Sequence, residues 1–157
     1  MNQLIIHRFN GIETFPIVTA KMFTVGKVND LTLWFEIETT EQGAQPNSDT
    51  SNFPANPNAE LGIKIAEFKL NNLAGMQLHY AGTDNDREDS CNALFYYYDH
   101  QPLRDNHIII SAQNSLNIFR VHWSARTQDV NYYDDNKPEA RIDIEANFYY
   151  DNTRVKD

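Results

Sequence analysis

The sequence predicts an all-β protein, built as an antiparallel β-sandwich or a strongly bent meander. Hydrophobic and polar residues alternate with a period of two in several segments, as they do in strands that bury one face. Aromatic residues make up 12% of the chain, and Phe and Tyr favour the pleated surface of a sheet. Strands do not alternate with long amphipathic helices, so a parallel α/β sheet is not expected.

The alternation is clearest in residues 141–148, where Ile142, Ile144, Ala146 and Phe148 are separated by charged or polar residues. Turn-forming residues at 101–106 and 134–138 indicate antiparallel connections between neighbouring strands. We expect about eight or nine strands in one domain that spans residues 1–157. The other expected strands are residues 4–9, 14–25 with a break at Pro16, 31–37, 76–80, 93–98, 108–112 and 119–123.

Residues 58–70 fit two patterns. Leu61, Ile63 and Ile65 alternate as in a strand, whereas Leu61, Ile65 and Phe68 have helical spacing behind a possible cap at Asn58. We expect a strand here, and a helix would make the fold α+β instead.

Residues 40–59 form a long polar segment with three prolines, and we expect a loop there. Phe53 is its one large apolar side chain. A loop of this length is typical either of a binding segment or of a mobile one, and Phe53 is therefore a candidate binding residue.

The chain is acidic, with 22 acidic and 13 basic residues and a formal net charge of −9. This charge argues against nucleic acid as a ligand and favours a basic protein partner. Cys91 is the single cysteine, and the first residues lack the features of a signal peptide. No segment is apolar enough to span a membrane. We therefore expect a cytoplasmic protein that does not bind membranes.

Short signatures of familiar enzymes, such as a phosphate-binding loop or a His-Glu-x-x-His motif, are absent from the sequence. The acidic run at residues 84–89 lacks the glycine and the final glutamate of a helix-loop-helix calcium site. The five histidines are dispersed without the close spacing that is typical of a metal site. We therefore expect no metal, no cofactor and no catalytic residue.

Two aromatic segments are candidates for recognition. Residues 95–98, Phe-Tyr-Tyr-Tyr, carry rings on both faces of a predicted strand, so an uncovered face would be an interface. Tyr and Asp are concentrated in a predicted connection, and this composition suits contact with a basic protein. The candidate binding residues of that connection are Asp129, Tyr132, Tyr133, Asp134 and Asp135.

These observations favour a non-catalytic protein-binding module, of the kind that inhibitor or immunity proteins use against a basic partner. The alternative is binding of a small, sugar-like molecule, or catalysis, in a β cavity lined by Arg120 and His122. A homo-oligomer that pairs through an aromatic strand face is a third possibility.

Overall fold

The computed structural model describes residues 1–27, 29–40, 56–82, 92–97, 100–129 and 138–151. Nearly all of this part of the chain is antiparallel β structure, with a short 3-10 helix at Leu70–Asn72. Ten strands are defined there: β1 (Gln3–Arg8), β2 (Gly11–Lys27), β3 (Asp30–Thr39), β4 (Asn58–Ile65), β5 (Gln77–Tyr80), β6 (Asn92–Tyr96), β7 (His100–Pro102), β8 (Arg104–Ser115), β9 (Ile118–Thr127) and β10 (Ala140–Tyr150).

The described strands form a single sheet in the order β5-β8-β9-β10-β1-β2-β3-β4-β6-β7. Consecutive members of this order pair in antiparallel fashion, and the end of β10 also makes a short parallel contact with β2. No pairing between the end strands β5 and β7 closes the described sheet into a barrel.

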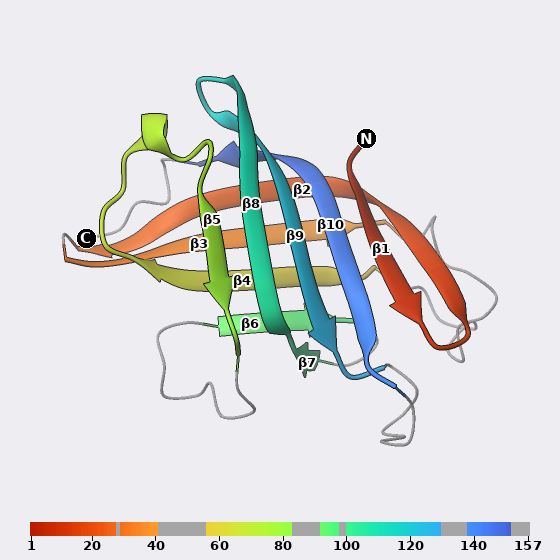
Figure 1. Ribbon diagram of the computed structural model, residues 1–157. Helices are drawn as coiled ribbons and strands as arrows, with labels where there is room; N and C mark the ends of the chain where they lie inside the picture. Colours follow the sequence, from red (N-terminus) through yellow and green to blue (C-terminus); the bar gives the residue numbers. More distant parts are fainter. Residues whose placement is uncertain (28, 41–55, 83–91, 98–99, 130–137, 152–157) are drawn as a thin grey trace.

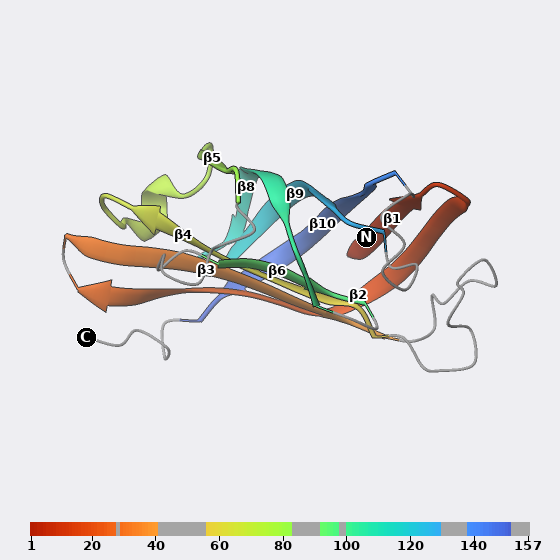
Figure 2. The ribbon, with the colours of Figure 1, turned by 90° about the horizontal axis from the view of Figure 1, so that it is seen from below.

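The sheet bends so strongly that it forms two layers whose strands cross steeply (Figures 1 and 2). One layer, the front layer in Figure 1, contains β5, β8, β9, β10 and β1, and the other contains β3, β4 and β6. Strand β2 joins them, because its first part pairs with β1 and its second part pairs with β3. The register shifts between Ile17 and Thr19, where β2 changes partner. The predicted sandwich or bent meander is confirmed.

The hydrophobic core lies between the two layers. Every second side chain of the long strands points inward, and the largest of these are completely buried. Phe35 of β3 and Phe148 of β10 meet edge to face across the core, with ring centroids 5.8 Å apart. Trp123 also lies in the core, and its indole nitrogen donates a hydrogen bond of 2.9 Å to the Asn106 side chain. The space between the layers is therefore filled by side chains.

The ambiguous segment 58–70 is a strand over its first part, since β4 covers Asn58–Ile65 and pairs with β3 and β6. The helical alternative was wrong because the inward positions Leu61 and Ile63 alternate with outward ones. Pro16 does not break β2, because it lies where the strand passes from one neighbour to the other.

The expected connection at residues 101–106 does not join adjacent strands. It contains β7 and the start of β8, and β6 pairs with β4 and β7 instead of β8. The chain changes layers at this point, so neighbours in sequence are not neighbours in space here.

Candidate functional site

Several predicted binding residues fall outside the described residues. These are Phe53 in the predicted loop at residues 40–59, and Tyr132, Tyr133, Asp134 and Asp135 in the connection between β9 and β10. Their part in binding stays a prediction.

Asp129, the first residue of the predicted Tyr/Asp connection, does not lie on the surface. It is 2% exposed, and both of its carboxylate oxygens accept hydrogen bonds from the Arg8 guanidinium. Arg8 Nε lies 3.0 Å from Oδ2, and Arg8 Nη2 lies 2.9 Å from Oδ1. The expectation that Asp129 faces a partner is therefore corrected, because this bidentate ion pair holds it inside the protein.

The ion pair belongs to a larger buried network. Arg8 Nη1 donates to Glu13 Oε1 over 3.1 Å, and the Tyr97 hydroxyl donates to Glu13 Oε2 over 2.5 Å. Burial opposes the charge on Arg8, but Asp129 and Glu13 outweigh it and raise the pKa of the guanidinium above its ordinary value. The network has a structural role. It connects the end of β1, the start of β2, the residue that follows β6 and the segment just after β9.

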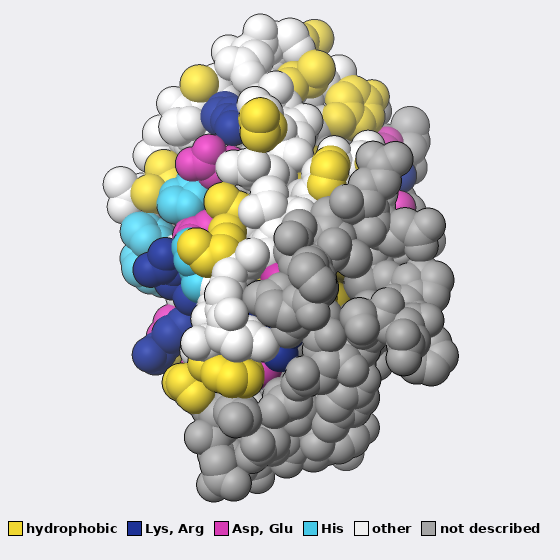
Figure 3. All heavy atoms as spheres, turned by 90° about the vertical axis from the view of Figure 1, so that its right-hand side faces the viewer, with side chains coloured by type: hydrophobic (Ala, Val, Ile, Leu, Met, Phe, Trp, Pro, Cys, Tyr) yellow, Lys and Arg dark blue, Asp and Glu magenta, His cyan; other side chains and the backbone are white. Residues whose placement is uncertain are grey.

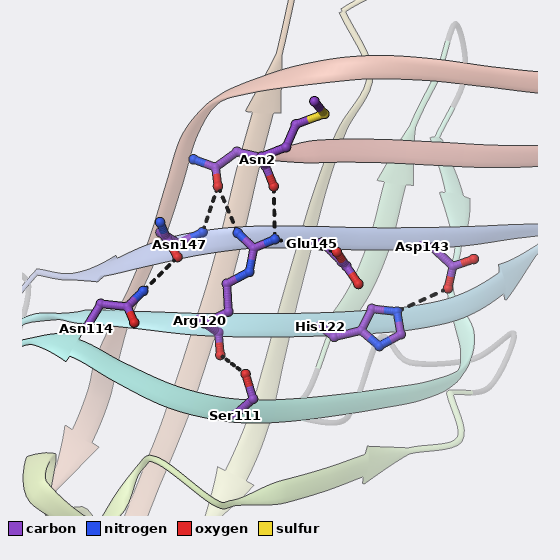
Figure 4. A network of polar contacts seen from close by, with 9 residues as sticks. Asn2, Ser111, Asn114, Arg120, His122, Asp143, Glu145 and Asn147 are labelled. Atoms are coloured by element: carbon purple, nitrogen blue, oxygen red, sulfur yellow. Dashed lines mark hydrogen bonds and ion pairs between the residues drawn. The ribbon is translucent and has the colours of Figure 1, made fainter.

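Arg120, predicted to line a cavity, lies on the outward side of the front layer and fixes the N-terminus there (Figure 4). Its guanidinium donates to the Met1 carbonyl oxygen over 2.9 Å and to Asn2 Oδ1 over 3.2 Å. The Asn147 backbone N–H donates to the same Asn2 oxygen. Arg120 is thus engaged in holding the chain end against β9 and β10.

His122 lies two residues further along β9, on the same outward side (Figure 4). His122 Nε2 is 3.3 Å from Asp143 Oδ1, and His7 Nε2 is 2.9 Å from Asp143 Oδ2, so one carboxylate contacts two imidazoles. These residues line an open depression of about 370 Å³, together with Arg141 and Glu145 among others. His122 thus lies beside other polar groups, but on an open surface, and Arg120 does not line this depression. The predicted β cavity lined by Arg120 and His122 is not found at this place.

Four of the five histidines lie on the outward side of the front layer. His79 of β5 stacks on His107 of β8, with ring centroids 4.1 Å apart, and β9 and β1 contribute His122 and His7. Figure 3 shows histidines beside arginines and carboxylates on this side. Sequence spacing could not reveal the group, because the strand order alone brings these residues together.

The outward side of the other layer has a different character, and we call it the acidic face. It carries Glu36 and Glu38 of β3 and Glu60 of β4. Glu36 lies directly opposite Glu60 in the strand register. Lys21 of β2 lies on the other flank of Glu36. A shallow depression of about 230 Å³ is lined by the three glutamates and by Asn58.

The electrostatics of Glu60 reflect this placement. Burial and the charge of Glu36 raise the pKa of Glu60 above its ordinary value, and His100 opposes the shift. Two carboxylates directly opposite each other on a sheet destabilise the fold by up to about 1 kcal/mol. The alternation in each strand indicates that both glutamates point outward, but the pairing of β3 with β4 was needed to show that they meet.

Aromatic side chains border the glutamates on the acidic face. Trp34, two residues before Glu36, lies over Gly62 of β4 and stacks on Phe23, with centroids 6.5 Å apart and planes inclined by 11°. On the other side, Tyr96 of β6 packs against His100 of β7, with centroids 5.0 Å apart. The sequence indicates that residues 95–98 carry aromatic rings on both faces of a strand. It does not indicate that β4 and β7 flank this strand, so the combination of aromatic rings and glutamates was not predicted.

Among the described residues, no group of three or more His, Cys, Asp or Glu side chains has an arrangement that could hold a metal ion. No helix in the described ranges has the length and hydropathy needed to cross a bilayer. Comparisons of the chain with protein-family models, curated proteins and solved structures found no significant match.

Proposed function

We propose that this protein is a non-catalytic binding module for a basic protein, and that the acidic face is its contact surface. The observation that carries the proposal is the register that places Glu36 opposite Glu60, with the pKa of Glu60 raised. A cationic side chain placed between the two carboxylates would relieve their repulsion. Relief of this repulsion would favour the binding of a basic partner at the acidic face.

The charge of the whole chain supports the same partner chemistry. The net charge of −9 attracts a basic protein over a distance and speeds its encounter. Within the described residues there are nine basic and twelve acidic side chains, a difference of −3, so the remaining segments contribute −6. The net charge of the whole chain thus attracts a basic partner, whereas Glu36, Glu38 and Glu60 would form the surface that the partner contacts.

Trp34 and Tyr96 make the acidic face more than a charged patch. Both are partly exposed, and aromatic rings contribute large contact areas with little loss of conformational entropy. An arginine or lysine that approaches the glutamates could also lie against the Trp34 ring and gain a cation–π interaction. Charge beside rigid aromatic area is typical of protein interfaces.

An inhibitor or immunity protein that neutralises a basic partner in the cytoplasm would use a surface of this kind. The alternative of sugar-like ligand binding, or catalysis, would rest on the depression at His7, His122 and Asp143. That depression is open, and small-molecule sites generally enclose most of the ligand surface. We therefore prefer protein binding.

Binding of a fluorescently labelled oligolysine peptide tests the proposal. The triple variant Glu36→Gln/Glu38→Gln/Glu60→Gln keeps the side-chain volumes and removes the charges of the acidic face. We expect its affinity, measured by fluorescence anisotropy, to fall about tenfold, which corresponds to about 1.4 kcal/mol.

The matched control is Asp105→Asn/Glu139→Gln/Glu145→Gln, which removes three charges from the front layer, and we expect less than about a twofold loss. Equal losses in the two variants would mean that only net charge matters and would refute the assignment of the acidic face. A loss confined to Tyr132→Ala/Tyr133→Ala would move the contact to the connection between β9 and β10.

A further inference from the structure

The front layer carries a row of cationic side chains that no part of the proposed function uses. Arg104 of β8 lies opposite Arg126 of β9, and Arg126 lies opposite Arg141 of β10. Arg141 in turn lies opposite His7 of β1. Directly opposed residues share a face, so three arginines and a histidine follow one another across four adjacent strands. We call this set the arginine row.

Carboxylates already contact the arginine row, and the contacts lie at the surface. Arg104 pairs with Glu139 over 3.1 Å, and Arg126 pairs with Asp105. The side chains of Arg126 and Asp105 are both more than half exposed. Exposed ion pairs of this kind contribute little to stability, so a carboxylate from another molecule can replace them at small cost.

Arg141 also contacts a carboxylate of its own layer and is also exposed. Its Nε lies 3.3 Å from Asp143 Oδ2, and its Nη2 lies 3.3 Å from His7 Nε2. The Asp143 carboxylate is shared with His7 and His122, so it compensates several donors at once. The side chains of the arginine row are partly exposed, so a ligand can reach them from solvent.

We propose that the arginine row is a second binding surface and that its ligand is an acidic segment of another protein. Like charges directly opposite each other are unfavourable, so a ligand that brings further carboxylates to the row would relieve the repulsion between neighbouring arginines. Arginine binds carboxylates in a bidentate manner, and neighbouring strands lie about 4.8 Å apart, so several carboxylates of one segment fit the row. The net charge of −9 opposes every polyanion, and it opposes the dense charge of a nucleic acid more than the few carboxylates of a short acidic segment.

The two proposed surfaces lie on opposite layers of the sandwich, as the ribbon shows (Figure 2). The acidic face belongs to β3 and β4, whereas the arginine row crosses β8, β9, β10 and β1. A basic and an acidic ligand could therefore occupy the protein together, and the arginine row can be tested without altering the acidic face.

The experiment measures binding of a labelled oligoglutamate peptide to the full chain by fluorescence anisotropy at low salt. We expect Arg126→Gln/Arg141→Gln to weaken binding about fivefold or more, and Arg126→Lys/Arg141→Lys to weaken it less, because lysine keeps the positive charge but loses the bidentate geometry. A thermal melt of each variant checks that the fold is retained. The matched control, Lys21→Gln/Lys64→Gln, removes two positive charges from the other layer and should change the affinity less than about twofold.

Three results would overturn the proposal. The first is the absence of binding to the unaltered chain. The second is an equal loss of affinity in the control variant. The third is tighter binding of a single-stranded oligonucleotide than of oligoglutamate, which would assign the row to nucleic acid.

Discussion

Glu60 combines a structural cost with a proposed role in binding. Its side chain is partly buried beside Leu94 and faces Glu36, and these surroundings disfavour its ionised form. Because the pKa of Glu60 is raised in the folded state, the folded protein holds this proton more tightly than the unfolded chain does. Stability is therefore lost as the pH rises from the ordinary glutamate pKa through the raised one.

We expect Glu60→Gln to increase the free energy of unfolding at pH 7 by up to about 1 kcal/mol. The gain should shrink as the pH falls through the raised pKa of Glu60, because Glu60 in the unaltered protein then becomes protonated. Urea unfolding at a series of pH values measures the difference. Glu38→Gln serves as the control, because Glu38 lies opposite Asn58 and not opposite a carboxylate. An equal increase in the free energy of unfolding for Glu38→Gln and Glu60→Gln would show that repulsion between Glu36 and Glu60 is not the cause.

Asp129, unlike Glu60, is a buried charged residue that holds the fold together through an ion pair with Arg8. Its sequence neighbourhood indicates a polar connection, yet its partner Arg8 lies at the other end of the chain. Removing Arg8 would leave two buried carboxylates without their cation, which is among the most destabilising changes in proteins. Removing Asp129 would leave Arg8 paired with Glu13 alone and without two of its hydrogen bonds. Its place in the core is therefore explained by the ion pair and not by local sequence.

The shape of the acidic face depends on one glycine, Gly62, which lies opposite Trp34 in the pairing of β3 with β4. A Cβ atom at Gly62 would lie 2.7–2.9 Å from the nearest atoms of the Trp34 ring, which is closer than packed atoms tolerate. The ring therefore lies on the sheet because Gly62 leaves room for it, and this arrangement sets the edge of the acidic face.

We expect Gly62→Ala to destabilise the protein by about 1 kcal/mol, since the Trp34 ring must move off Gly62, which disturbs its stacking on Phe23. In a Trp34→Leu background the same change should be neutral or slightly stabilising, because alanine restricts the unfolded chain more than glycine does. Urea unfolding of Gly62→Ala, Trp34→Leu and the double variant gives the coupling free energy between positions 34 and 62. An equal cost of Gly62→Ala in both backgrounds would show that the Trp34 ring is not the cause.

Most individual strands could be predicted from the sequence, and their pairing could not. The alternation of Ile142, Ile144 and Phe148 with polar residues reports which side is buried, since that pattern is local. β7 escaped prediction because it is three residues long and ends at Pro102. The pairing of β3 with β4 is a long-range property, so no local pattern placed Glu36 opposite Glu60 or gathered the histidines.

At the scale of the whole molecule, the bend of one sheet creates two outward surfaces of different charge. The strong bend follows from β2, which is long enough to pair with β1 at one end and β3 at the other. The bend folds the sheet into two layers (Figure 1). It buries the apolar sides of both layers in one core and leaves their polar sides on opposite faces. We therefore expect a basic ligand to approach only the layer that carries the acidic face.

An NMR titration of the isotopically labelled protein with oligolysine tests this central claim most directly. We expect the largest chemical-shift changes in β3 and β4, at the amides of Glu36 and Glu60 and at the Trp34 indole N–H. We expect small changes at His7, His122 and their neighbours on the front layer. Shifts centred on the front layer, or spread evenly over both layers, would contradict the proposal that the acidic face binds a basic partner.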